Sequence, residues 1–161
     1  MTHTLTLTHI MGMGFCGYGY GSAFSDPGLT HGDPYAPVAC WDSIHSILCI
    51  AALNNLELHH INVKNAYLNA PLKEEIYMVA PKECGARYWQ LQKGLYGLRQ
   101  AGRQWYIHLH ETYLSLGFSR CKSDWSMYTR WSATGISISA TSVDDLLLVS
   151  NSKVESDLAA A

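Results

Sequence analysis

Two apolar runs near the end of the chain flank a pair of adjacent aspartates, and this arrangement constrains the fold more than any other feature. Residues 135–141 alternate apolar with small polar side chains, and residues 146–149 are Leu-Leu-Leu-Val. The pattern is typical of two β-strands, so it predicts a β-hairpin with Asp144 and Asp145 at its tip. The two like charges repel each other by about 1 kcal/mol in water, and an ordinary tight turn would use Asn-Gly or Asp-Gly instead. A divalent cation that binds both carboxylates removes this penalty; a solvated surface turn is the alternative explanation of the pair alone.

Composition limits the classes of protein to which the chain can belong. Its 161 residues are 48% hydrophobic and 15% charged, which indicates a globular chain with a core rather than a disordered one. No apolar run reaches about 18 residues, and no basic segment precedes an apolar one at the N-terminus. We therefore expect neither a transmembrane helix nor a secretory signal. The five cysteines show neither metal-binding nor disulfide spacing, which predicts a reducing, intracellular environment.

The basic residues are unevenly distributed along the chain. The net charge is −2, the first Lys or Arg is Lys64, and all 11 basic residues lie from there onward. A surface that binds nucleic acid or triphosphate must therefore come from the later two thirds of the chain, apart from any contribution of histidine.

Hydrophobic periodicity predicts a mixture of helices and strands. An apolar spacing of three to four residues predicts a helix over 43–54, with Asp42 or Ser43 as its N-cap. The same spacing predicts a second helix over 101–116, which Gly117 ends. Short β-prone runs predict strands at 56–63, 75–79, 88–93 and 126–131, with a helical turn at 65–69.

A glycine-rich segment close to the N-terminus resembles a nucleotide-binding motif. Residues 12–17 fit the pattern G-x-G-x-x-G, which binds a dinucleotide only when a helix begins at the third glycine. Residues 18–21 are Tyr-Gly-Tyr-Gly, and two interior glycines cost a helix about 2 kcal/mol. The sequence thus argues against a nucleotide-binding module that takes NAD at this segment.

Several motifs in one order resemble the reverse transcriptase domain of copia-type LTR retrotransposons. Residues 62–69 (N-V-K-N-A-Y-L-N) are similar to the family's D-V-K-x-A-[FY]-L-N, and residues 74–78 read E-E-I-Y-M, as the family does. Residues 95–106 (L-Y-G-L-R-Q-A-G-R-Q-W-Y) are similar to L-Y-G-L-[KR]-Q-x-P-R-x-W-Y. Residues 142–145 (S-V-D-D) stand where Y-V-D-D belongs. The resemblance covers roughly residues 27–151.

The resemblance implies an α+β fold, with the fingers and palm of a polymerase and a small antiparallel β-sheet packed on helices. It divides the chain into a divergent Gly-rich segment (1–26), a fingers and palm fragment (27–152) and a short truncated tail (153–161). Because the chain stops soon after the hairpin, we expect no thumb and no RNase H domain.

The implied chemistry is two-metal transfer of a nucleotide to a primer 3′-hydroxyl, with Mg²⁺ or Mn²⁺ as the cofactor. By resemblance, Asp144 and Asp145 are catalytic metal ligands, and Asn62 occupies the position of the family's first catalytic aspartate. The implied partners are an RNA or DNA primer–template and dNTPs. The implied substrate-binding residues are Lys64, Asn65, Ala66, Tyr67, Gly97, Arg99 and Arg103.

Each of these substrate-side residues has a role by resemblance. Backbone N–H groups of residues 64–66 would receive the triphosphate, and the ring of Tyr67 would exclude a 2′-hydroxyl. Gly97 would permit close approach of the nascent base pair, while Arg99 and Arg103 would contact phosphates. The alternatives are that Tyr67 is a core residue and that the two arginines belong to a solvated face.

Three departures from the family pattern argue against full activity. Asn62 replaces the first catalytic aspartate, and a neutral amide is a poor ligand for bridging two cations. Ser142 replaces the usual aromatic residue, and Gly102 replaces the usual proline. Losing one carboxylate removes several kcal/mol of transition-state stabilisation. At about 1.4 kcal/mol per tenfold in rate, this loss slows the chemistry by orders of magnitude. We predict a reverse transcriptase fragment with little or no activity, located by resemblance in the cytoplasm or a virus-like particle. The alternative is a non-catalytic nucleic-acid-binding or scaffold remnant of a retroelement polyprotein.

Overall fold

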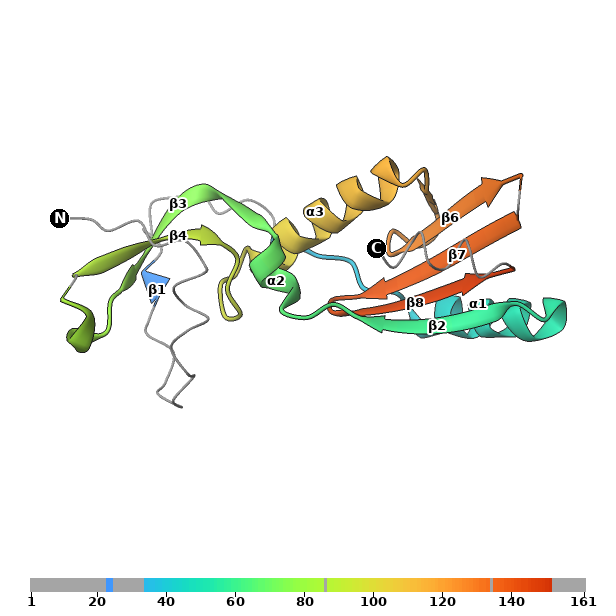
Figure 1. The fold of residues 1–161 in the computed structure, drawn as a ribbon, viewed down its shortest axis with the longest axis horizontal. Coiled ribbons are helices and arrows are strands. Elements are labelled where there is room, and N and C mark those ends of the chain that lie inside the picture. Colours follow the sequence, from blue (N-terminus) through green and yellow to red (C-terminus); the bar gives the residue numbers. More distant parts are fainter. Residues whose placement is uncertain (1–22, 25–33, 86, 134, 152–161) are drawn as a thin grey trace. The chain divides into compact units, whose positions relative to one another are not determined.

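The computed structural model describes residues 23–24, 34–85, 87–133 and 135–151 (Figure 1). The dinucleotide-like glycine pattern and the C-terminal tail lie outside these residues. The chain divides into two compact units, each drawn from two stretches of sequence. The first contains residues 1–35 and 67–105, and the second contains residues 36–66 and 106–161.

Helices and antiparallel strands are mixed along the chain, which confirms the predicted α+β class. Within the described ranges, the helices are α1 (Trp41–Asn54), α2 (Ala66–Asn69), the 3-10 helix η2 (Lys82–Cys84) and α3 (Ala101–Ser115). The strands are β1 (Ala23–Phe24), β2 (Glu57–Asn62), β3 (Pro71–Val79), β4 (Tyr88–Lys93), β5 (Ser119–Arg120), β6 (Met127–Ser132), β7 (Gly135–Ser142) and β8 (Asp145–Ser150). No helix in this part of the chain has the length and apolarity needed to cross a membrane.

An antiparallel sheet with the strand order β2-β8-β7-β6-β5 forms the centre of the second unit. Strands β7 and β8 form the hairpin predicted from the sequence, with Ser142 opposite Asp145. Strand β2 comes from much earlier in the chain and pairs with β8, from Glu57 opposite Ser150 to Asn62 opposite Asp145. This long-range pairing brings the end of β2 to the hairpin turn.

Helix α1 covers one face of this sheet. Its buried residues Ile47 and Ala51 pack with Ile138 and Ala140 of β7 and with Val149 of β8. Ile47 has no exposed surface, and complete burial of an isoleucine side chain stabilises a fold by about 1.5–3 kcal/mol. Alternate residues of β7 therefore define the α1 face of the sheet.

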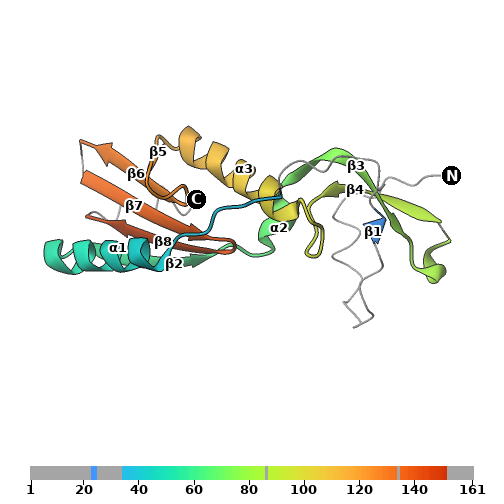
Figure 2. The ribbon, with the colours of Figure 1, turned by 180° about the vertical axis from the view of Figure 1, so that it is seen from behind.

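The part of α3 that belongs to this unit covers the opposite face (Figure 2). Tyr113 of α3 packs with Phe118, Tyr128 and Leu148, and its ring stacks on that of Tyr128 at a centroid distance of 4.2 Å. The Tyr113 and Ser139 hydroxyl oxygens are 2.6 Å apart. Burial raises the pKa of Tyr113, so this hydroxyl remains protonated at neutral pH.

The N-terminus of α1 differs from the prediction. The helix begins at Trp41, and Cys40 is its N-cap residue rather than Asp42 or Ser43. Cys40 makes no side-chain capping bond; instead, its backbone N–H donates to Oδ2 of Asp124 at 3.1 Å. The acceptor comes from a loop 84 residues away, so the local sequence could not indicate it.

The C-terminus of α3 agrees with the prediction. Gly117 has φ of +80°, a conformation that glycine adopts without strain. The N–H of Phe118 donates to the carbonyl of Tyr113, and the N–H of Gly117 donates to that of Leu114. This pair of bonds is a Schellman motif, which satisfies carbonyls that a helix end leaves open.

A smaller antiparallel sheet with the order β1-β3-β4 belongs to the first unit. Ile76 and Leu91 are buried opposite each other at its centre. Strand β3 begins at Pro71, earlier than the predicted start at residue 75, and its register shifts between Pro71 and Ile76. After β4, the buried Gln100 donates from Nε2 to Oε2 of Glu74 at 3.1 Å and ties the following loop to β3.

Candidate active site

Asp144 lies in the turn of the β7–β8 hairpin, and Asp145 follows directly after it. Because Ser142 pairs with Asp145, Val143 and Asp144 form a two-residue turn and Asp145 is the first residue of β8. The prediction that both aspartates occupy the tip is thus wrong for Asp145. Val143 has φ of +53°, a region that β-branched residues rarely adopt. The turn therefore has the positive φ of tight hairpins without the usual glycine or asparagine.

Asn62 lies beside the hairpin turn. It is the last residue of β2 and stands directly opposite Asp145 of β8. One residue later, the N–H of Val63 donates to the carbonyl of Asp144 at 2.7 Å. The backbone therefore brings together the three positions that the resemblance assigns to catalysis.

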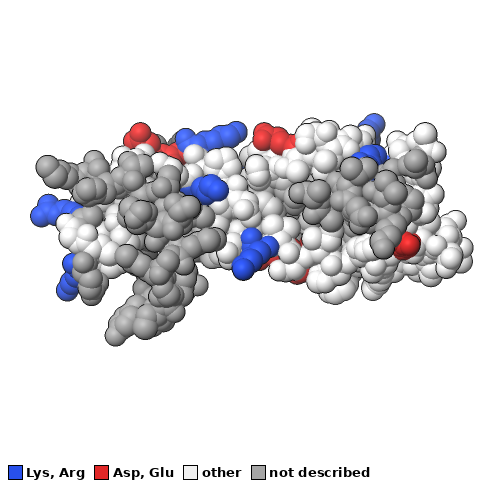
Figure 3. All heavy atoms as spheres, in the orientation of Figure 1, with Lys and Arg blue, Asp and Glu red and all other residues white. Residues whose placement is uncertain are grey.

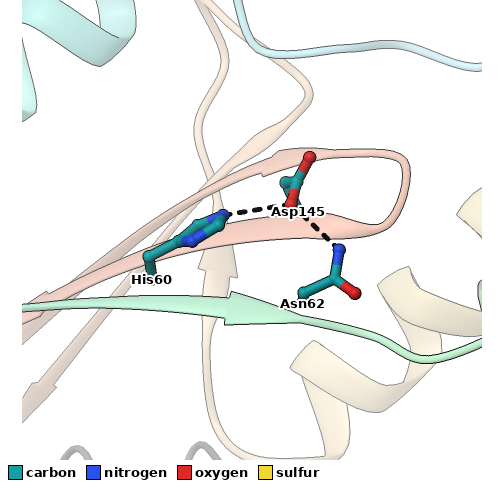
Figure 4. A network of polar contacts seen from close by, with 3 residues as sticks. All are labelled: His60, Asn62 and Asp145. Carbon is teal, nitrogen blue, oxygen red and sulfur yellow. Dashed lines mark hydrogen bonds and ion pairs between the residues drawn. The ribbon is translucent and has the colours of Figure 1, made fainter.

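A histidine that the sequence analysis did not single out joins this group (Figure 4). His60 Nε2 is 3.0 Å from Oδ1 of Asp145, and Asn62 Nδ2 donates to the same oxygen at 3.1 Å. His60 and Asn62 are two residues apart on β2, so both side chains lie on one face of the strand. Hydrogen bonds from Asn62 and then His60 hold the pKa of the Asp145 carboxyl below its usual range. The only sequence signal for His60 was its spacing from Asn62 on a predicted strand.

The residues present do not fit a pair of bound divalent cations. Asn62 is neutral, and both groups that contact Oδ1 of Asp145 are nitrogen donors rather than oxygen ligands. Among the described residues, no group of three or more His, Cys, Asp or Glu side chains could hold a metal ion. Hard cations such as Mg²⁺ require several oxygen ligands, and this arrangement offers few.

The residues predicted to receive the triphosphate follow β2 directly. Lys64 and Asn65 are exposed, and Asn65 has φ of +55°. Ala66 is fully buried and begins the short helix α2. These three residues belong to the second unit, together with the aspartates.

Tyr67 belongs to the first unit and packs against another aromatic residue. Its half-buried ring lies 4.3 Å from that of Tyr96, centroid to centroid, at a tilt of 34°. Gly97 is exposed and has φ of +99°, which explains the glycine at that position. Gly94 was missed by the sequence analysis: a Cβ there would lie 2.8 Å from the Tyr67 carbonyl oxygen. Gly94 therefore allows the loop after β4 to approach the backbone of Tyr67.

The two predicted phosphate-binding arginines differ in their surroundings. Arg99 is exposed, whereas Arg103 is half-buried and donates from a guanidinium nitrogen to the backbone oxygen of Tyr35 at 3.3 Å. Arg103 thus makes a hydrogen bond within its own unit. Both arginines, like Tyr67 and Gly97, belong to the first unit, and the three candidate catalytic residues belong to the second.

Comparison with known proteins agrees with the motifs. The family model described as "Reverse transcriptase (RNA-dependent DNA polymerase)" matches residues 20–158 of the chain. The chain belongs to the reverse transcriptase family. No solved structure shows a significant match.

Its relatives are Pol polyproteins of retrotransposons. The chain is 32% identical over 133 residues to the retrovirus-related Pol polyprotein from transposon RE2 of Arabidopsis thaliana. The matched segment covers 80% of this chain and 9% of the relative. It is 36% identical over 132 residues to that from transposon TNT 1-94 of Nicotiana tabacum (78% and 10%). It is 32% identical over 133 residues to the transposon Ty1-ER2 Gag-Pol polyprotein of Saccharomyces cerevisiae (76% and 7%). The predicted copia-type retrotransposon family is confirmed, and the chain spans a tenth or less of the length of these relatives.

Proposed function

We propose that this reverse transcriptase chain corresponds to the fingers and palm of a copia-type RNA-directed DNA polymerase, and that it has little or no polymerase activity. The five-stranded sheet between α1 and α3, with the aspartate hairpin formed by its interior strands β7 and β8, supports a palm in the second unit. The first unit, with its three-stranded sheet, is the proposed fingers. The proposed location is the cytoplasm or a virus-like particle.

The position of Asn62 is the observation that carries the proposed loss of activity. In the ancestral reaction, the primer 3′-hydroxyl attacks the α-phosphate of a dNTP and releases pyrophosphate, which requires stabilisation of developing negative charge. Asn62 stands opposite Asp145. At position 62, the family motif has an aspartate. The amide instead donates a hydrogen bond to Asp145, so the site lacks one anionic ligand.

The proposed substrates of the ancestral enzyme are an RNA or DNA primer–template and dNTPs. Lys64, Asn65 and Ala66 remain the predicted contacts to the triphosphate, and Tyr67 the predicted barrier to a 2′-hydroxyl. The predicted contact of Gly97 with the nascent base pair also remains, supported by its exposed position.

Primer extension on poly(rA)/oligo(dT) tests the proposal, with Mg²⁺ and with Mn²⁺. The chain itself is compared with Asn62→Asp and Asp144→Ala. We expect extension at background level in the natural chain and in Asp144→Ala. Extension by the natural chain that Asp144→Ala abolishes would contradict the proposed inactivity.

A second candidate is a chain that binds nucleic acid without catalysis. Residues 67–105 contain six Lys or Arg and three Asp or Glu, against a net charge of −2 for the whole chain. Figure 3 shows scattered basic side chains rather than one continuous patch on the visible face. The composition supports contacts with phosphates through individual residues such as the exposed Arg99.

For this candidate we expect Arg99→Gln to weaken binding of poly(rA)/oligo(dT) and to reduce the salt dependence. Each lost phosphate contact lowers the slope of log K against log salt by about 0.9. Fluorescence anisotropy over a range of salt concentrations measures both effects. Arg87→Gln is the matched control, because Arg87 is an exposed arginine of the same unit. Equal slopes for the two variants would exclude the proposed contact.

A further inference from the structure

The oxygen of Asp145 nearest to Asn62 is already occupied by protein groups. Oδ1 lies 3.0 Å from His60 Nε2 and 3.1 Å from Asn62 Nδ2. A carboxylate oxygen has two lone-pair positions for hydrogen bonds or metal ions. With an N–H group at each position, a cation can reach Oδ1 only by displacing one of them.

The two donors reach this oxygen from different positions on one strand. His60 and Asn62 project from the same face of β2, and Asp145 belongs to the neighbouring strand β8. Replacing only Asn62 with aspartate would leave the imidazole in place beside Oδ1. A charge-assisted hydrogen bond is stronger than a neutral one, so this remaining contact still opposes the binding of a cation.

We propose that His60 is a second determinant, alongside Asn62, that weakens the binding of divalent cations at the aspartate pair by occupying Oδ1 of Asp145. The three side chains form a clamp that is independent of metal and ties the end of β2 to the β7–β8 hairpin. This proposal rests on the proposed function in one respect, because it takes Asp144 and Asp145 as the ancestral metal ligands. It adds that Asn62→Asp alone restores cation binding only in part, and it makes His60 a positioning residue that acts through Asp145.

Binding of Mn²⁺ tests this directly, since loss of the electron paramagnetic resonance signal of free Mn²⁺ measures the bound ion without any polymerase activity. The variants are Asn62→Asp, His60→Thr and the double variant, each titrated with Mn²⁺ alone and then with competing Mg²⁺. Threonine suits a β-strand but is too short to reach Asp145. His59→Thr in the Asn62→Asp background is the matched control, because His59 points to the other face of β2 and lies 3.5 Å from Glu57.

We expect the double variant to bind Mn²⁺ about 3- to 10-fold more tightly than Asn62→Asp. The gain is of this size because one charge-assisted hydrogen bond at an exposed site no longer competes with the cation. The His59→Thr control should leave the affinity of Asn62→Asp unchanged. Equal affinity in the double variant and Asn62→Asp would overturn the proposal. Weaker binding in the double variant would also overturn it, because the imidazole would then be a metal ligand.

A stability measurement keeps the proposal testable if Asn62→Asp fails to fold. In the natural chain, the clamp predicts that His60→Thr lowers the urea midpoint and that Asp145→Ala lowers it further. Combined with Asp145→Ala, His60→Thr should have no additional effect, because its partner is already absent. Fully additive losses would show that His60 does not act through Asp145.

The two proposals can fail separately. If Mn²⁺ binding follows the expected order while primer extension stays at background in every variant, the clamp stands and the ancestral activity has not been regained. If Asn62→Asp alone binds Mn²⁺ as tightly as the double variant and extends primers, the clamp is wrong and the proposed lesion at Asn62 is correct.

Discussion

Asp124 shows how one side chain can join two distant parts of the chain. Its Oδ2 accepts from the N–H of Cys40 at 3.1 Å, and its Oδ1 accepts from the N–H of Ser126 at 2.9 Å. Burial by itself raises the pKa of Asp124, but hydrogen bonds from Ser43, Ser126 and Cys40 outweigh it and leave the pKa below its usual range. The ionised carboxylate therefore fixes the start of α1.

The low pKa of Asp124 has a consequence for the pH dependence of stability. Because the folded-state pKa lies below the unfolded value of about 3.9, the contribution of Asp124 is present above that pH. It is lost as the pH falls through the folded-state pKa. We expect Asp124→Asn to lower the free energy of unfolding by about 1 kcal/mol at pH 7, allowing for the partial exposure of the site. Urea unfolding at pH 7 and at pH 2 to 4 should show the difference shrinking in acid.

Asp42→Asn is the control for this experiment. Asp42 lies in the first turn of the same helix and is exposed. Its loss removes only a favourable interaction with the helix dipole, worth about 0.3–1 kcal/mol. A larger effect at Asp42 than at Asp124 would mean that the long-range bond contributes little.

Gly94 gives a steric prediction at the residue scale. A Cβ at this position would lie 2.8 Å from the backbone oxygen of Tyr67, so the backbone must move to accommodate it. We expect Gly94→Ala to destabilise the chain by about 1–3 kcal/mol, as overpacking usually does, and to change the near-ultraviolet circular dichroism of the Tyr67–Tyr96 pair. Gly85→Ala is the comparison, because a Cβ there meets open space and reports the cost of φ of +64° alone. Natural stability and an unchanged spectrum in the Gly94→Ala variant would rule out the close approach.

Hydrophobic periodicity predicted the helices and strands that bury one regular face. Helices α1 and α3 and strand β4 were predicted to within two residues, because each alternates apolar and polar positions at its own period. The start of β3 was missed, because residues 71–75 carry charged side chains and shift register. Strand β5 has two residues and exists through its pairing with β6. Pairing partners of that kind cannot be read from local sequence.

The candidate site was predicted only in part, because the pairing of distant strands cannot be read from local sequence. The resemblance supplied Asn62, Asp144 and Asp145, and the structure brings these residues together at adjoining strand ends. His60 was missed because the contact depends on the register between two strands whose residues are 85 positions apart. A single sequence indicates that two strands exist more readily than it indicates which residues stand opposite one another.

The hairpin turn gives a prediction at the element scale. Val143 adopts φ of +53°, and such strain costs about 1–3 kcal/mol in a residue other than glycine. We expect Val143→Gly to stabilise the chain by about 1 kcal/mol, since relief of strain exceeds the entropic cost of glycine of about 0.5–1 kcal/mol. Chemical denaturation measures the change, and Val149→Gly, within β8, should destabilise. A loss of stability on Val143→Gly would mean that the side chain contributes more than the strain costs.

At the scale of the whole molecule, helix α1 presents apolar residues on its outer side. Trp41 is 74% exposed and Leu53 is 85% exposed, although the inner side of the helix is buried against the sheet. Exposed apolar residues grouped on one helix favour association. We expect self-association that increases with concentration and that Leu53→Lys reduces, measured by sedimentation velocity. Leu114→Lys, at a half-exposed position of α3, is the control; an equal effect of both variants would argue against a role for α1.

The order in which the chain is synthesised has a consequence for folding. In the described part of the chain, β2 pairs with β8 alone, and the partner of Asn62 lies 83 residues later. At the usual 5–20 residues per second, that delay at the ribosome is on the order of 4–17 s. Both edges of β2 are unpaired during this interval, and its Leu58 is open to other chains. Until its partner emerges, β2 can pair with another copy of the chain, so association between nascent chains competes with folding.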